Sequence, residues 1–294
     1  MAKHDEDKSS KGQLIPAPHH FFPLQDAARL GVFKEAIEQT VPKDGKVVEL
    51  GGGTGVLSFF AARRAAKVWC VERDPVLADM AEKLIAGNAV ADRVEVVVAD
   101  AMEYLPPEPV DAVICSMLDV GLLRKKQVAV VESFKRRYRQ AFPGRELPVF
   151  IPEASILAAQ PVRQSFDFCG YQAPVTLICD PAARNEGTTG LADPVVYQMA
   201  IYGQDLPSML VGELEVRMAT GGALNAVRFI TKNAVAILVK EKRTLDWFNF
   251  YLVAPLARPM LVAAGEVVRI RFNYEPGAGI SALTTTLKVS RKTA

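Results

Sequence analysis

The sequence predicts a two-domain protein, in which a Rossmann-like α/β domain precedes an antiparallel β-barrel or sandwich. Between residues 46 and 116, short apolar strands alternate with segments of helical periodicity, which is typical of a parallel sheet covered on both faces. Beyond residue 150, short apolar strands recur about every ten residues between Gly, Pro, Asn and Asp, with little helical periodicity. We therefore expect the domain boundary near residue 150.

The composition disfavours several classes of protein. The chain has 294 residues, of which 50% are hydrophobic and 23% charged, and its net charge of +2 argues against nucleic acid as a partner. No run approaches the ~20 apolar residues of a membrane helix and no secretory signal is recognisable, so we expect a cytoplasmic protein. The three histidines, His4, His19 and His20, all lie within the first 20 residues, before the predicted helices and strands, which disfavours Ser-His-Asp hydrolases and metal sites.

The first domain is expected over residues 14–150, after a disordered tail at residues 1–13. An amphipathic helix should run from Leu24 to Thr40, and a strand at Lys46–Leu50 should lead through a glycine loop into a helix ending near Arg64. The remaining elements expected here are strands at Lys67–Val71, Val94–Val98 and Ala112–Ser116 and a helix at Pro75–Asn88. The second domain, residues 151–294, is expected to contain strands at Ser155–Ala159, Val195–Tyr202, Gly212–Met218, Ala234–Val239, Phe248–Val253 and Val267–Asn273.

The glycine loop after the first strand is the strongest local signal. A phosphate-binding P-loop ends in Gly-Lys-Ser/Thr, but Thr54-Gly55-Val56 has no lysine. A dinucleotide fold uses G-x-G-x-x-G, whereas the spacing here is Gly51-x-Gly53-x-Gly55. The loop therefore suits a nucleoside-sized ligand without a pyrophosphate.

Acidic residues stand at the ends of three successive predicted strands. Glu49 precedes the glycine loop, where a carboxylate accepts from an ammonium group, and Glu72 ends the second strand, where a carboxylate accepts from ribose hydroxyls. Asp100 follows the third strand and is placed to receive an adenine amino group. S-adenosylmethionine carries an amino acid, a ribose and an adenine, which match these three acidic residues in order. The alternative is that Glu72 and Asp100 only cap turns.

These residues resemble the class I S-adenosylmethionine-dependent methyltransferases, and within them the protein arginine methyltransferase family. The segment from His20 through Pro23, Leu24, Asp26 and Arg29 to Phe33 is similar to the family's N-terminal helix motif. Residues 48–58 resemble its cofactor loop, and residues 71–73 its ribose-binding strand end. The resemblance implies that Arg29 binds the carboxylate of the cofactor. The cofactor site that it implies comprises His20, Arg29, Glu49, Gly51, Gly53, Gly55, Leu57, Glu72, Arg73, Asp100, Ala101 and Met102.

The second half carries further landmarks of the same family. Phe150-Ile151-Pro152-Glu153 resembles the junction between its two domains, and residues 246–256 and 265–266 resemble parts of its barrel. The interval 171–195 is long enough for the arm through which family members form ring-like dimers. The resemblance therefore implies a homodimer.

The main departures from the family lie where the substrate arginine would bind. The family holds the guanidinium between two glutamates in the loop after the fourth strand, and the matching positions here are Ser116 and Lys125. The family's Thr-His-Trp turn is replaced by Thr244-Leu245-Asp246-Trp247. A guanidinium ~4 Å from Lys125 would be repelled by roughly 1 to 4 kcal/mol.

The altered site leaves five candidate catalytic residues. Asp119 is the one acid in the loop and could orient an amine or act as a base, although a helix N-cap is the alternative. Lys125 could pair with a carboxylate or phosphate of the substrate, or simply lie on a solvated helix face. Asp26 and Asp246 are expected to face one another across the site, and Ser116 occupies a glutamate position.

Three functions remain open. The chain is predicted to be an active methyltransferase for a small-molecule or other non-arginine acceptor. The second hypothesis is methylation of arginine or another protein group, with an acid such as Asp119 or Glu132 standing in for the missing glutamates. The third is a non-catalytic interaction subunit, against which the intact cofactor residues argue.

Overall fold

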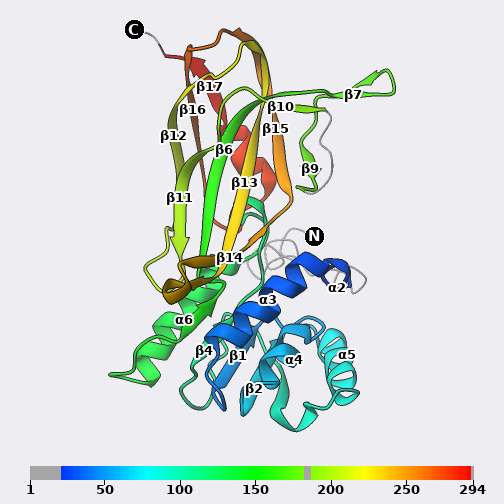
Figure 1. Ribbon diagram of the computed structural model, residues 1–294, viewed down its shortest axis with the longest axis vertical. Helices are drawn as coiled ribbons and strands as arrows, with labels where there is room; N and C mark the ends of the chain where they lie inside the picture. Colours follow the sequence, from blue (N-terminus) through cyan, green and yellow to red (C-terminus); the bar gives the residue numbers. More distant parts are fainter. Residues whose placement is uncertain (1–20, 182–186, 293–294) are drawn as a thin grey trace, which may run out of the picture.

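The computed structural model describes residues 21–181 and 187–292. The predicted tail at residues 1–13 and the proposed cofactor residue His20 lie outside the described residues. An α/β domain and an elongated β domain pack end to end, and helix α3 lies near their contact (Figure 1). No helix in the described ranges is long and apolar enough to cross a membrane.

The α/β domain is built on five parallel strands in the order β3-β2-β1-β4-β5. The strands are β1 (Lys46–Leu50), β2 (Lys67–Glu72), β3 (Val94–Val98), β4 (Ala112–Ile114) and β5 (Val149–Ile151). Strands β1 and β4 are buried along nearly their whole length, as expected where helices cover both faces of a parallel sheet. The predicted fold class is thus confirmed for this half.

Helices connect these strands and precede them. They are α2 (Phe22–Gln25), α3 (Ala27–Thr40), α4 (Val56–Ala62), α5 (Pro75–Ala86) and α6 (Gln127–Ala141), with short 3₁₀ turns η2 (Ala91–Arg93) and η3 (Val120–Leu122). The helix expected from Leu24 is divided at Asp26, whose side chain accepts from the backbone N–H of Arg29 and so begins α3. Helix α6 was not among the predicted helices, because its second half is rich in Lys and Arg.

The β domain contains three antiparallel sheets. The largest has the order β10-β6-β13-β15-β9, with β11 beside β6 and β14 beside β13; a second has the order β12-β16-β17, and β7 and β8 form a hairpin. The strands are β6 (Ala154–Gln164), β7 (Asp167–Phe168), β8 (Tyr171–Gln172), β9 (Leu177–Cys179), β10 (Thr188–Gly190), β11 (Val195–Ile201), β12 (Leu210–Arg217), β13 (Gly222–Leu238), β14 (Arg243–Phe248), β15 (Tyr251–Val262), β16 (Val267–Tyr274) and β17 (Lys288–Arg291). A 3₁₀ turn, η4 (Val239–Glu241), precedes β14, and a helix, α7 (Ile280–Thr286), precedes β17.

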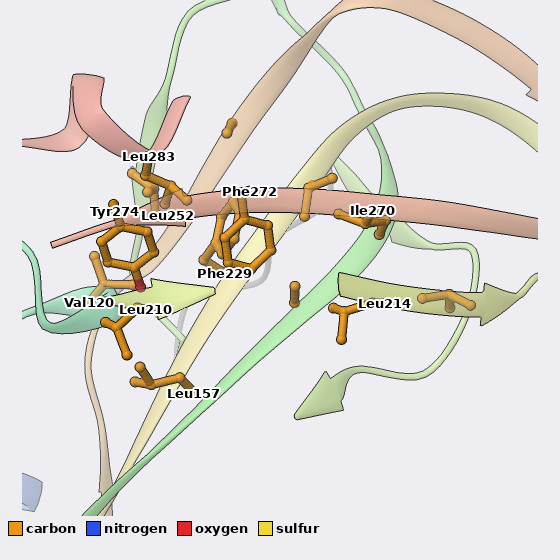
Figure 2. Packing of buried hydrophobic residues seen from close by; sticks show 14 of the residues in the cluster. Val120, Leu157, Leu210, Leu214, Phe229, Leu252, Ile270, Phe272, Tyr274 and Leu283 are labelled. Atoms are coloured by element: carbon orange, nitrogen blue, oxygen red, sulfur yellow. The ribbon is translucent and has the colours of Figure 1, made fainter. Parts of the chain in front are cut away.

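The core of the β domain lies between its two larger sheets and is capped by α7. Figure 2 shows Phe229 from β13 and Phe272 from β16 side by side at the centre, with Leu283 of α7 nearby. The rings of Phe229 and Phe272 meet edge to face with centroids 5.1 Å apart, an arrangement that aromatic pairs favour. This packing holds the two larger sheets of the β domain together, and the α/β domain packs against them.

Apolar contacts join the two domains. Phe33 and Ile37 of α3 belong to the same buried cluster as Val235 and Ala236 of β13 and Leu245 of β14. Burial of such side chains stabilises a contact by about 1.5–3 kcal/mol each, so α3 is held firmly against the β domain. The helix that carries Arg29 is therefore positioned by residues far away in the sequence.

A buried polar chain lies beneath this contact. The Ser155 hydroxyl donates to Oδ1 of Asn233 at 2.7 Å and lies 2.8 Å from the Tyr202 hydroxyl, and Asn233 donates to Asn249 at 2.7 Å. All four side chains are at least nine-tenths buried. Buried polar groups of this kind specify one arrangement of strands, because each lost partner leaves an unsatisfied group.

We expect Asn233→Ala to lower the free energy of unfolding by about 2–3 kcal/mol, because it removes the acceptor of the Ser155 hydroxyl and the donor to the buried side-chain oxygen of Asn249. Asn273→Ala, at an exposed position of β16, is the matched control and should change it by less than about 0.5 kcal/mol. Urea unfolding of both variants measures the difference. Equal effects of the two substitutions would show that the polar chain contributes nothing specific.

Candidate active site

The strand order places a topological switch point between β1 and β4. Open parallel sheets bind their ligands in the crevice outside the carboxyl ends of the strands at such a point. The glycine loop, residues 51–55, follows β1, and the loop of residues 116–126, which we call the acceptor loop, follows β4. The two loops touch, because the side chain of Met117 lies 3.1 Å from where a Cβ on Gly51 would be.

Backbone geometry explains the glycines of the loop. Gly51 and Gly55 have φ angles of 80° and 77°, in the left-handed region that other residues rarely adopt. A Cβ on Gly55 would also lie 2.7 Å from Cδ1 of Ile85, so a larger residue there would require that side chain to shift. The loop thus presents bare main chain at the switch point, as a closely bound nucleoside requires.

Glu72 ties the glycine loop to the end of β2. One carboxylate oxygen accepts from the Gly53 N–H at 2.9 Å, and the other accepts from the N–H groups of Arg73 and Asp74 at 2.7 and 3.0 Å. Glu72 is half-buried, and its two oxygens have further lone pairs beyond the three that these N–H groups use. The residue holds the loop in place while remaining available as an acceptor.

The segment after β3 carries the next three predicted cofactor residues, Asp100, Ala101 and Met102. Asp100 accepts from the Met102 N–H at 2.9 Å, Ala101 is buried, and the Met102 carbonyl accepts from Ser133 of α6. Asp100 therefore caps a turn, as its alternative interpretation held, and a single oxygen is used in doing so. Leu57, another predicted cofactor residue, is buried at the start of α4 in the apolar cluster of the α/β domain.

Glu49 lies fully buried beneath the loop. Its Oε2 accepts from the N–H and the hydroxyl of Ser58, at 2.8 and 2.5 Å. Burial raises the pKa of Glu49 to about 7, although the Ser58 hydrogen bonds and the charge of Arg29 lower it, and the charge of Glu72 raises it further. The carboxyl group is therefore poised to ionise when a cation binds beside it.

Arg29 is the buried cation of the site. Its guanidinium is 8% exposed and lies over the rings of Phe33 and Trp247, at 5.2 and 5.6 Å from their centroids. Burial lowers its pKa, while the charges of Asp26 and Glu49 raise it. Within residues 21–181 and 187–292, no carboxylate forms an ion pair with this guanidinium, which leaves its donors to an anionic ligand.

Asp26 and Asp246 have separate partners. Asp26 Oδ2 accepts from the indole N–H of Trp247 at 3.1 Å, whereas Asp246 pairs with Lys232 at 2.8 Å and accepts from Thr244. Side chains alternate along β14, so Asp246 points to the face opposite Trp247. The expected facing pair of carboxylates is therefore not formed, and Trp247 rather than Asp246 meets Asp26.

Asp119 is engaged within the acceptor loop. Its two oxygens accept from Nε and Nη2 of Arg124 at 2.6 and 2.7 Å, in the fork geometry typical of arginine–carboxylate pairs. Its side chain caps no helix, because η3 lacks a side-chain cap bond at Asp119. The pair forms because Leu122 and Arg124 adopt left-handed φ angles of 54° and 55°, which fold the loop back on itself.

Lys125 and Ser116 flank this pair. Lys125 is half-buried, and burial lowers its pKa; the charge of Asp119 raises it, and the charges of Arg29 and Arg124 lower it further. The buried Arg29 is thus one of the charges that act on the Lys125 ammonium. Neither Lys125 nor the hydroxyl of Ser116 has a side-chain partner within the part of the chain that the structure describes. Glu132, in contrast, pairs with Lys135 and accepts from the Leu206 N–H.

The β domain fixes the shape of the acceptor loop. Thr231 of β13 accepts from the Gly121 N–H at 2.7 Å, and the hydroxyl of Tyr274 of β16 donates to the Gly121 carbonyl at 2.8 Å. Arg124 donates its backbone N–H to Ala278. Thr231, Tyr274 and Trp247 were not among the predicted site residues, because their contacts with the site span more than 100 residues and leave no local signal.

Comparison with known proteins agrees with this geometry. Residues 47–141 match the model of a methyltransferase domain. An uncharacterized protein of Methanothermobacter thermautotrophicus is 30% identical over 272 residues, which cover 92% of this chain and 97% of that protein. The arginine N(omega)-methyltransferase of Streptomyces achromogenes is 30% identical over 109 residues, which cover 35% of this chain and 30% of that enzyme.

Solved structures share the fold. A chain of the Trypanosoma brucei PRMT1 enzyme–prozyme heterotetrameric complex with AdoHcy has a TM-score of 0.69 and 15% identity, with 91% of this chain and 95% of that chain covered. Arabidopsis thaliana protein arginine methyltransferase 10 has a TM-score of 0.69 and 16% identity, with 85% of each chain covered.

The fold and the site define a class I S-adenosylmethionine-dependent methyltransferase with the two-domain architecture of the protein arginine methyltransferases. Within this class, the chain belongs to the same family as the uncharacterized Methanothermobacter protein, to which it is similar over nearly its whole length. The predicted enzyme class, cofactor and fold class are confirmed.

We expect Glu49 to make the stability of the ligand-free protein depend on pH. Its pKa is about 7 in the folded state and near 4.5 when unfolded, so the folded protein holds the proton more tightly. Glu49 therefore destabilises the fold progressively as the pH rises from 4.5 to 7, by about 2 to 3 kcal/mol between pH 5 and pH 8.

Urea unfolding of the wild type and of Glu49→Gln at pH 5, 6, 7 and 8 measures this effect as the difference between the two curves. Glu82→Gln, at an exposed position of α5, is the control and should follow the wild type. Parallel curves for the wild type and Glu49→Gln would contradict the proposed environment of Glu49.

Proposed function

We propose that the chain transfers a methyl group from S-adenosylmethionine to a small-molecule or other non-arginine acceptor. The observation that carries this proposal is the charge of the acceptor loop. Its one carboxylate, Asp119, is held by both of its oxygens on Arg124, and the two positions that bear glutamates in the arginine methyltransferases are Ser116 and Lys125.

The proposed cofactor residues lie along the crevice from α3 to the end of β3. Arg29 would donate hydrogen bonds to the carboxylate of the cofactor, and Glu49 beneath the glycine loop would accept from the ammonium group of the cofactor. Glu72 would accept from the ribose hydroxyls, and Asp100 from the adenine amino group. Gly51, Gly53, Gly55, Leu57, Arg73, Ala101 and Met102 complete the proposed set among the described residues.

A guanidinium acceptor is unfavourable in this loop. A cation ~4 Å from the Lys125 ammonium is repelled by roughly 1 to 4 kcal/mol, depending on the local dielectric. It would also lack the two charge-assisted hydrogen bonds that a pair of free carboxylates supplies, each worth about 1.5–3 kcal/mol. Releasing Asp119 would require breaking its fork with Arg124.

The chain needs to supply little beyond orientation. The sulfonium of bound S-adenosylmethionine supplies a reactive methyl group. Holding the acceptor in line with that group accounts for most of the rate enhancement expected of such a site, and the acceptor loop is well suited to it because Thr231 and Tyr274 fix its backbone. Asp26 acts through Trp247, whose indole N–H does not titrate near neutral pH, so this pair positions rather than relays a proton.

Arginine methylation is the second candidate. It is favoured by the names of relatives that match 34–40% of this chain, among them the Streptomyces arginine N(omega)-methyltransferase and a probable histone-arginine methyltransferase of Arabidopsis thaliana. Asp119 would then have to leave Arg124 and accept the substrate. The charge of the loop makes this the less favourable alternative.

We also propose that the chain forms a homodimer through the interval 171–195 and the hairpin before it. The β7–β8 hairpin projects from the β domain (Figure 1), and Phe168 and Tyr171 are 45% and 73% exposed. Large exposed aromatic side chains on a projecting hairpin are typical of contact surfaces. Residues 182–186 of this interval lie outside the described residues.

We expect methyl-labelled S-adenosylmethionine, incubated with the purified chain and a cell extract, to label the small-molecule fraction. Free arginine and histones, supplied separately, should take up no label above the level given by Glu72→Ala, which removes a proposed cofactor contact and serves as the control. Chromatography by size and amino-acid analysis of the protein fraction measure the distribution.

N-methylated arginine in the hydrolysed protein would overturn the proposed acceptor class. Absence of label in every fraction, despite measurable binding of S-adenosylhomocysteine, would contradict catalysis and favour a non-catalytic subunit.

A further inference from the structure

Gly121, at the centre of the acceptor loop, is bound from two sides by the β domain. Its N–H donates to Oγ1 of Thr231 at 2.7 Å, and its carbonyl accepts from the Tyr274 hydroxyl at 2.8 Å. Thr231 is fully buried and Tyr274 is 3% exposed, so water does not compete for these hydrogen bonds. A Cβ on Gly121 would lie 3.0 Å from the Tyr274 hydroxyl oxygen, so the close approach of this hydroxyl favours glycine.

The chain that follows β16 binds the next residues of the same loop. The Gly277 N–H donates to the Leu122 carbonyl at 2.7 Å, and the Ala278 carbonyl accepts from the Arg124 N–H at 2.8 Å. Residues 274–278 therefore run along the acceptor loop and bind its backbone at three points, the first of which is the Tyr274 hydroxyl at the end of β16.

The three loop residues bound by this segment are those with unusual backbone. Gly121, Leu122 and Arg124 adopt φ angles of 62°, 54° and 55°. Left-handed backbone is unfavourable for residues that have a Cβ, and it persists where the surrounding structure holds it. The turn brings the Arg124 guanidinium to both oxygens of Asp119, at 2.6 and 2.7 Å. The internal fork of the loop thus depends on a conformation that the β domain maintains.

Tyr197 fixes the hydroxyl of Tyr274. The two phenol oxygens lie 2.7 Å apart, and because the single proton of the Tyr274 hydroxyl goes to Gly121, Tyr197 is the donor. The Tyr197 ring meets Phe272 edge to face, with centroids 4.9 Å apart. Figure 2 shows the Tyr274 ring in the core of the β domain, together with Val120 of the acceptor loop. The position of the Tyr274 hydroxyl is therefore set by the packing of this core.

We propose that Tyr274 is a positioning residue that determines which groups of the acceptor loop can reach the acceptor. Its hydroxyl holds Gly121 in the left-handed turn, and the turn keeps Asp119 on Arg124. Asp119, the one acid among residues 116–126, is thereby withheld from the acceptor. This inference rests on the proposed function and deepens it, because it assigns the preference against a cationic acceptor to a residue outside the loop.

Two substitutions that each remove one tyrosine hydroxyl test this role. Tyr274→Phe removes the hydrogen bond to Gly121, whereas Tyr197→Phe removes only the bond between the two tyrosines and leaves Gly121 held. Asp119→Ala breaks the fork directly and is the reference for a released loop. Deuterium exchange of residues 116–126 reports the loop, and exchange of β1 reports global unfolding, which would speed both.

We expect Tyr274→Phe and Asp119→Ala to speed deuterium exchange of residues 116–126 roughly tenfold, while exchange of β1 changes by less than about threefold. Tyr197→Phe should change exchange of both segments by less than about threefold. In the transfer assay with a cell extract, Tyr274→Phe should lower the small-molecule label about tenfold, because the acceptor is no longer held in line. Binding of S-adenosylhomocysteine, measured by calorimetry, should change by less than about twofold in both tyrosine variants.

Three results would overturn the inference. Unchanged loop exchange in Tyr274→Phe would show that the loop keeps its shape without this hydroxyl. Equally faster exchange in both tyrosine variants would show a general loosening of the core. Faster exchange with an unchanged label would show that the shape of the loop does not govern transfer. Label on protein arginine, or in no fraction, from the wild type would instead refute the proposed function, whereas the exchange measurements need no acceptor and still decide whether Tyr274 positions the loop.

Discussion

A buried cation at the contact between the two domains constrains the rest of this structure. The Arg29 guanidinium lies between Phe33 of its own helix and Trp247 of the β domain, and Asp26 fixes Trp247 from below through the indole N–H. A buried charge costs several kcal/mol unless nearby opposite charge offsets it, and Asp26 and Glu49 provide this only in part. One aromatic ring beside Arg29 comes from each domain, so these surroundings of the guanidinium form only when the domains are packed together.

The charges of the acceptor loop decide which chemistry the site favours. In a loop with two free carboxylates, an arginine side chain would be the natural occupant, because a planar guanidinium pairs with carboxylates in a fork. Here the fork is internal to the loop, between Asp119 and Arg124, and the remaining charges of the loop are the positive charges of Lys125 and Lys126. The same backbone therefore presents the opposite electrostatic face to an acceptor, and the fold alone does not determine the substrate.

The parts of the molecule that could be predicted are those encoded by local patterns in the sequence. Apolar strands ending in Glu72 and before Asp100 located the crevice, because parallel strands place their carboxyl ends on one edge of the sheet. Asp119 was predicted as an acid that orients an amine or acts as a base, or alternatively as a helix N-cap. Its pairing with Arg124, five residues away, was not predicted, because the contact depends on left-handed backbone at Leu122 and Arg124. The contact between Asp26 and Trp247 spans 221 residues and follows from domain packing, which no local pattern reports.

The most direct test of this account is a crystal structure of the chain with S-adenosylhomocysteine. We expect the homocysteine carboxylate to lie within about 3 Å of the Arg29 guanidinium, with the ammonium group of the ligand near Glu49 and the Asp119–Arg124 fork intact. A carboxylate bound away from Arg29, or Asp119 released from Arg124, would contradict the electrostatic account of the site.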